Sequence, residues 1–152
     1  MYQRIFVPLD GSPTATRGLS EAIRLAKNQG GELRLFHIAD ERVLDCGFGP
    51  GTYGSALIES ARDEGRKILS DAQSLAEAGG IGAEILLMDS PGGQVASLII
   101  AQAKAWAADL IVMGTHGRRG VSRMAMGSDA ECVVRNALVP VLLIRHVETA
   151  ES

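Results

Sequence analysis

The stretch that decides the fold is LIVMGTHGRRGVSRMAMGSDAE, which runs from residue 110 to residue 131. It begins with consecutive apolar residues, the pattern of a parallel strand that is covered on both faces. The run ends at Gly114, and further glycines and three arginines follow before Gly127-Ser128 opens a helical pattern. A buried strand that leads through a glycine-rich loop into a helix is typical of an α/β protein.

Apolar runs and helical patterns alternate along the rest of the chain. Strands are predicted at 4–9, 32–39, 83–89, 109–114 and 139–147. Helices are predicted at 14–29, 55–78, 93–107 and 128–138, and a polar loop is predicted at 40–54. This alternation predicts one α/β domain, a five-stranded parallel sheet sandwiched by helices. Because the first, fourth and fifth strands are apolar on consecutive residues, we expect both of their faces to be buried.

The composition excludes several classes of function. The chain has 152 residues, a net charge of −3 and 4% aromatic residues, so neither a basic surface nor a stacking platform for nucleic acid is expected. Cys46 and Cys132 form no CxxC pair, which argues against a zinc site or a disulfide framework and fits a reducing compartment. No signal peptide and no membrane-spanning run are recognised. We therefore expect a cytoplasmic protein that binds neither nucleic acid nor membranes.

The loop between Gly114 and Ser128 has the context of a phosphate-binding site. In a parallel sheet, the junction of a strand with the next helix lies at the carboxyl edge, where ligands bind. Glycines allow a positive φ and a close approach of backbone N–H groups to an anion, and the start of a helix attracts negative charge. The arginines add positive charge. The residues alone leave a second interpretation open, a flexible loop with solvated arginines and an ordinary Ser128 N-cap.

A second glycine pattern, GPGTYG at 49–54, matches G-x-G-x-x-G letter for letter. A dinucleotide-binding fingerprint needs a strand that runs directly into its first glycine. Here a polar segment separates the predicted strand from Gly49, and Pro50 stiffens the turn. We interpret this pattern as a surface loop.

The spacing Gly114-x2-Gly117-x9-Gly127-Ser128 resembles the G-2x-G-9x-G-[ST] nucleotide motif of the universal stress protein family. The segments RIFVPLDGSPTA, LFHIAD, ADLIVMGTHGRRG and VPVLLIR resemble that family in the same order, so the resemblance covers essentially the whole chain. It implies a Rossmann-like fold of the adenine nucleotide alpha-hydrolase type over residues 1–147, with a short C-terminal tail at 148–152. Family members with this motif bind ATP, so ATP, or ADP or AMP in its place, is the expected ligand.

The resemblance also implies roles for individual residues. Asp10 would reach the ribose or a Mg²⁺ ion held by the phosphates. Ile38 would offer its backbone to the adenine, and Met113 would pack near the base or the ribose. The nucleotide site as a whole is predicted to comprise Pro8, Leu9, Asp10, Ile38, Met113, Gly114, His116, Gly117, Arg118, Gly127, Ser128 and Asp129.

Asp129 departs from the family pattern, which has a small or apolar residue after Gly-Ser. A carboxylate suits the first turn of a helix but repels a triphosphate, unless it helps to hold Mg²⁺. Among the other candidates, His37 is interpreted as a packed core residue and Trp106 as core. His116 is either a phosphate donor or a solvated side chain.

The expected function is an ATP-binding regulatory or signalling module of the stress response. One alternative is a slow Mg²⁺-dependent ATPase, although no positioned base or nucleophile, and so no catalytic residue, is recognised. Another is a dimeric interaction protein whose site is empty or holds a ligand other than ATP. The apolar last strand would be an exposed sheet edge. Since the family pairs its final strands across a two-fold axis, we expect a homodimer through residues 139–146; the sequence names no protein partner.

Overall fold

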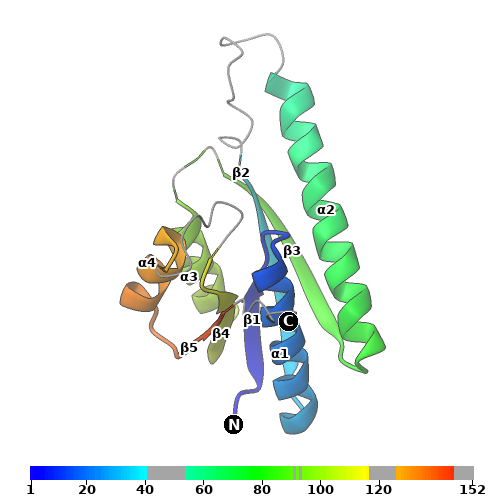
Figure 1. Cartoon of the computed structure of the whole chain (residues 1–152), viewed down its shortest axis with the longest axis vertical. Helices are drawn as coiled ribbons and strands as arrows, with labels where there is room; N and C mark the ends of the chain where they lie inside the picture. The colour runs from blue at the N-terminus through cyan, green and yellow to red at the C-terminus, as the bar shows by residue number, and fades with distance from the viewer. Residues whose placement is uncertain (41–53, 91, 93, 117–125, 146–152) are drawn as a thin grey trace, which may run out of the picture.

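The computed structural model describes residues 1–40, 54–90, 92, 94–116 and 126–145. Strands and helices alternate from the first element to the last, which confirms the predicted α/β class (Figure 1). The elements in chain order are β1 (Arg4–Pro8), α1 (Pro13–Gln29), β2 (Glu32–Asp40), α2 (Gly54–Ala78), β3 (Ala83–Ser90), α3 (Val95–Ala105), β4 (Leu110–Gly114), α4 (Ser128–Asn136) and β5 (Val141–Ile144). The GPGTYG pattern lies outside the described residues except for Gly54, which begins α2.

The five strands form one parallel sheet in the order β3-β2-β1-β4-β5. From β1 the chain builds outward to β2 and β3, and it then crosses back to add β4 on the other side of β1. The order therefore reverses between β1 and β4, where Ile5 lies opposite Leu110 and Phe6 opposite Ile111. A crevice at such a switch point is where open α/β sheets bind their ligands.

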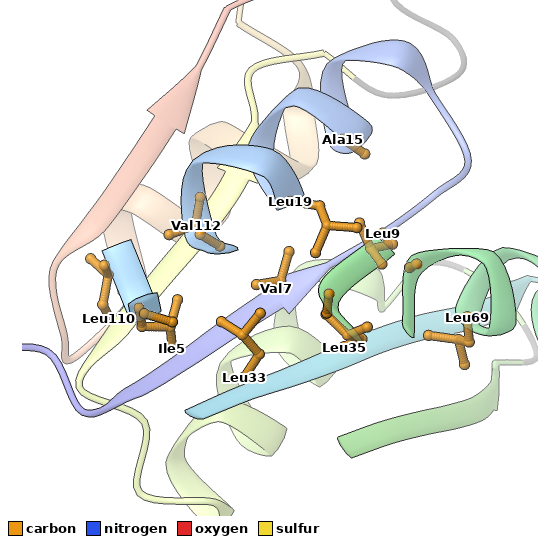
Figure 2. Packing of buried hydrophobic residues seen from close by; sticks show 14 residues of the cluster. Ile5, Val7, Leu9, Ala15, Leu19, Leu33, Leu35, Leu69, Leu110 and Val112 are labelled. Atoms are coloured by element: carbon orange, nitrogen blue, oxygen red, sulfur yellow. The ribbon is translucent and has the colours of Figure 1, made fainter. Parts of the chain in front are cut away.

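Helices cover both faces of the sheet, with α1 and α2 on one face and α3 and α4 on the other (Figure 1). Alternate residues of β1 serve the two layers, as the two-residue period of a strand requires. Val7 lies under Leu19 of α1, and its neighbour Leu35 on β2 lies toward Leu69 of α2 (Figure 2). Phe6 points to the opposite face, where its ring lies 5.3 Å from that of Phe36 and 6.5 Å from that of Trp106. Trp106 is buried, which confirms its predicted place in the core.

Helix α1 carries its own start and stop signals. Ser12 is the N-cap, and its Oγ accepts a hydrogen bond of 3.1 Å from the Ala15 N–H, while Pro13 supplies a fixed φ at the first helical position. Gly30 ends the helix at a φ of 67°, in the left-handed region that glycine favours. These two caps fix where α1 begins after β1 and where it ends before β2.

The edge position of β5 is confirmed, but its predicted burial on both faces is wrong. All four of its residues are half-buried, because a strand at the end of the sheet has a neighbour on one side only. The strand is also shorter than the predicted segment 139–147, since it spans Val141–Ile144. None of the helices in the described part of the chain is long and apolar enough to cross a membrane.

Candidate ligand-binding site

Two of the predicted site segments meet at the switch point of the sheet. Pro8 ends β1 and is followed by Leu9 and Asp10, and Met113 to His116 form the end of β4 and its exit. Because β1 and β4 are paired and parallel, both segments leave the sheet at the same edge and next to each other. Ile38 lies further along the same edge, near the end of β2.

Hydrogen bonds hold Leu9 and Asp10, the two residues after β1. The Leu9 N–H donates to the Phe36 carbonyl at 2.7 Å, and the Leu9 carbonyl lies 2.7 Å from Nδ1 of His37. The next residue, Asp10, accepts a hydrogen bond of 2.9 Å from the Ser12 N–H through Oδ1. The half-buried Asp10 carboxylate is thus anchored at the carboxyl edge, above the start of α1.

Gly114 lets α1 pack directly against the end of β4. A Cβ atom on Gly114 would lie 2.8 Å from Cγ2 of Thr14 and 3.2 Å from the Thr14 carbonyl carbon. The sequence predicts two reasons for the glycines of the motif, positive φ angles and close approach. Gly114 is not in the left-handed region, and Gly127 has a φ of −61°. Close approach, not an unusual φ, is what requires glycine at position 114.

Thr115 joins the end of β4 to β5 and to the start of α4. Its N–H donates to the Ile144 carbonyl of β5 at 2.9 Å, and its carbonyl accepts from the Gly127 N–H at 2.7 Å. The Thr115 hydroxyl lies 2.9 Å from Nδ1 of His116. The second of these bonds brings the start of α4 back to the end of β4. Gly117 and Arg118, two of the predicted site residues, lie outside the described residues.

The N-cap of α4 is Gly127, and the first hydrogen bond of the helix runs from the Glu131 N–H to the Gly127 carbonyl at 3.0 Å. An ordinary N-cap at Ser128 is therefore wrong, because Ser128 already belongs to the first turn. Its side chain is exposed, as is that of Asp129. The first N–H groups of a helix have no partner within the helix, and they carry its positive dipole end. This end can accept an anion, and Asp129 and Glu131 stand beside it.

Two predicted contacts belong to the core under the site. Met113 is buried on the face that α3 and α4 cover, and the half-buried Ile38 packs against the same cluster. His37 faces the opposite layer and is buried, which confirms its interpretation as a packed core residue. The contributions of Thr14 and Thr115 were not predicted from the sequence. Neither residue has a local signal, because their contacts depend on strand order.

The described residues contain no group of three or more His, Cys, Asp and Glu side chains that could hold a metal ion. Asp89, at the end of β3, is engaged elsewhere: the Arg62 guanidinium donates to both of its oxygens, at 3.0 Å to Oδ1 and 2.6 Å to Oδ2. These hydrogen bonds hold the pKa of Asp89 below its usual value. Asp89 therefore fastens α2 to β3 as a carboxylate, and Asp10 is the acidic side chain that stands at the switch point.

The fold defines a Rossmann-like α/β protein, and the candidate site lies where the strand order of its parallel sheet reverses, between the ends of β1 and β4. The model of the universal stress protein family matches residues 1–145, and the chain belongs to this family.

The relatives match the chain over most of its length. It is 31% identical over 145 residues to universal stress protein MJ0531 of Methanocaldococcus jannaschii, a match that covers 95% of this chain and 83% of the relative. A solved universal stress protein family structure from Burkholderia pseudomallei is 34% identical, with a TM-score of 0.76 over 94% of this chain and 96% of that chain. The universal stress protein of Archaeoglobus fulgidus in complex with dAMP is 26% identical, with a TM-score of 0.68 over 94% of this chain and 98% of that chain.

Replacing Gly114 by alanine tests the close packing of α1 on β4. We expect Gly114→Ala to lower the free energy of unfolding by about 1–3 kcal/mol, because the new methyl group overlaps Thr14. Gly82→Ala is the matched control: no heavy atom lies within 4 Å of its Cβ position, so this change should be neutral or stabilise by about 0.4–1 kcal/mol. Urea unfolding followed by the fluorescence of Trp106 measures both. Equal effects of the two substitutions would contradict the packing described for Gly114.

Proposed function

We propose that this protein binds an adenine nucleotide, ATP in particular, and acts as a regulatory module of the stress response. The observation that carries the proposal is the hydrogen bond from Gly127 to Thr115, which brings the start of α4 next to the strand end that neighbours Asp10. One edge of the sheet thus offers a helix start for phosphates and a carboxylate for a sugar or a metal ion. The dAMP bound by the Archaeoglobus fulgidus relative supports an adenine nucleotide as the ligand.

The phosphates are proposed to lie at the start of α4. The N–H groups of its first turn and the exposed Ser128 hydroxyl are the donors, and Gly114 and His116 line the same position from β4. We assign Gly117 and Arg118 to the phosphate chain on the strength of the sequence motif. The helix start favours a bound anion by about 0.3–1 kcal/mol, so side-chain donors must supply the rest of the affinity.

The nucleoside is proposed to lie between the ends of β1 and β2. Asp10, fixed through the Ser12 N–H, would take the ribose or a Mg²⁺ ion on the phosphates. Pro8 and Leu9 would form the floor beside the sugar, with the Ile38 backbone at the adenine and Met113 beneath it. Because the described side chains offer no cluster of metal ligands, phosphate oxygens and water molecules would supply most ligands of the ion.

Asp129 makes the proposed site favour a nucleotide that carries Mg²⁺ over the free nucleotide. Its carboxylate belongs to the first turn of α4, next to Ser128, and at short range it repels a bare triphosphate. A Mg²⁺ ion on the phosphates would offset this repulsion. We therefore propose that the ligand is the magnesium complex of ATP and not the free nucleotide.

Thermal unfolding with MgATP tests the nucleotide proposal. A ligand at a hundred times its Kd stabilises the folded state by about 2.7 kcal/mol, so millimolar MgATP should raise the Tm clearly. Ser128→Ala should weaken binding by roughly tenfold, since it removes a hydrogen bond to a charged group. The control Ser74→Ala changes an exposed serine of α2 and should leave the Tm shift intact. A Tm that stays flat in MgATP would overturn the proposal.

We further propose a homodimer through residues 139–146. The edge strand β5 is apolar and half-buried, and two neighbouring apolar side chains are exposed, Leu138 at 78% and Val134 at 43%. The carbonyls of Pro140 and Ile144 accept hydrogen bonds from β4. Since successive peptide groups of a strand point to opposite sides, Val141 and Leu143 turn their N–H groups to the free edge. A second copy of β5 could pair there across a two-fold axis.

Leu143→Pro tests this edge. It removes an N–H group that points away from β4, a position where an edge strand tolerates proline, so the subunit should stay folded and become monomeric. Leu143→Ala keeps the N–H and should remain dimeric. Sedimentation velocity over a range of concentrations measures the mass. A wild-type protein with a monomer mass at every concentration would refute the dimer.

A further inference from the structure

His37 is a buried titratable residue to which the proposed contacts give no role. It lies next to Ile38 in β2, but it faces the α1–α2 layer and is only 8% exposed. Its Nδ1 atom lies 2.7 Å from the Leu9 carbonyl oxygen. A carbonyl can only accept, so Nδ1 carries the proton and donates this bond. The imidazole of β2 thereby holds the backbone at the exit of β1.

This bond completes a double attachment of Leu9. The Leu9 N–H donates to the Phe36 carbonyl at 2.7 Å, so two consecutive residues of β2 fix both polar groups of Leu9. The next residue is Asp10, followed by Gly11 at a φ of 82° and the cap of α1. The two hydrogen bonds of Leu9 fix the direction in which the chain leaves the sheet. This direction determines where the Asp10 carboxylate lies.

The imidazole is confined from the side of α2. A Cβ atom on Gly65 would lie 2.7 Å from Cδ2 and 3.3 Å from Nε2 of His37, and 2.7 Å from Cδ1 of Leu87. The ring therefore fills the space between α2 and the Leu9 carbonyl. With a glycine at 65 the ring fits in this orientation, and with any larger residue the ring or the helix must move.

We infer that His37 is a positioning residue for the nucleotide: through the Leu9 carbonyl it sets the place of the Asp10 carboxylate. It does not touch the ligand. The inference rests on the proposed function, in which Asp10 contacts the ribose or the Mg²⁺ ion of the nucleotide. Without the imidazole, the buried Leu9 carbonyl loses its hydrogen-bond donor. The turn from Leu9 to Ser12 then loses the contact that fixes its first residue.

The test is a double-mutant cycle between His37 and Asp10, read out as MgATP affinity by titration calorimetry. His37→Leu removes the donor and should weaken binding by roughly tenfold in the wild-type background, but by little in an Asp10→Ala background. His37→Asn is the conservative control, since its amide nitrogen can take the place of Nδ1 and should restore most of the affinity.

A purely structural histidine would give a different pattern. His37→Leu would then lower the free energy of unfolding while the affinity changed by the same factor with and without Asp10, or not at all, and either result overturns the inference. Gly65→Ala provides a second route if His37→Leu fails to fold, because it displaces the ring from α2. It should weaken binding only where Asp10 is present. A wild-type protein that shows no MgATP binding refutes the proposed function itself, and the inference with it.

Discussion

The contact between Gly114 and Thr14 is the constraint on which the rest of the site depends. It brings the first turn of α1 against the end of β4, so that the exits of two paired strands share one small region. Helix α1 also packs closely on the sheet one and two turns later: Gly18 lies near the backbone of Met113, and Ala22 is fully buried. Small residues at this interface let the helix approach the sheet. The Asp10–Ser12 turn leads directly into the helix that this contact holds against β4.

Hydrogen bonds then connect this region to the rest of the sheet. Thr115 binds the backbone of both β5 and Gly127, and His37 binds the Leu9 carbonyl from β2. Groups on β2, on β5 and on the segment after β4 thus hold the backbone around the exits of β1 and β4. Since buried backbone groups are costly to leave without partners, these hydrogen bonds stabilise the arrangement of the two strand exits.

The order of the elements could be predicted because each carries a local signal, as in the Ser12-Pro13 start of α1 and the apolar run of β4. The assignment of Pro8, Asp10 and Gly114 to one edge follows from that order alone. The edge position of β5 could be predicted, but its half-burial could not, because its consecutive apolar residues form the same pattern as a strand that is covered on both faces. Contacts such as Gly114 with Thr14, or His37 with Leu9, depend on strand order and register, which local patterns do not contain. The start of the predicted helix at residue 128 agrees with α4, but the sequence left Ser128 open as an alternative N-cap to Gly127, because Ser128 is the better capping residue.

The central claim is that an adenine nucleotide binds at the switch point, with its phosphates at the start of α4. The most direct measurement is a crystal structure of the chain grown with Mg²⁺ and a non-hydrolysable ATP analogue. The account predicts density for the phosphates beside Gly127 and Ser128, and for the ribose or the metal ion beside Asp10. An analogue bound elsewhere on the protein, or an empty crevice at a saturating concentration of the analogue, would contradict it.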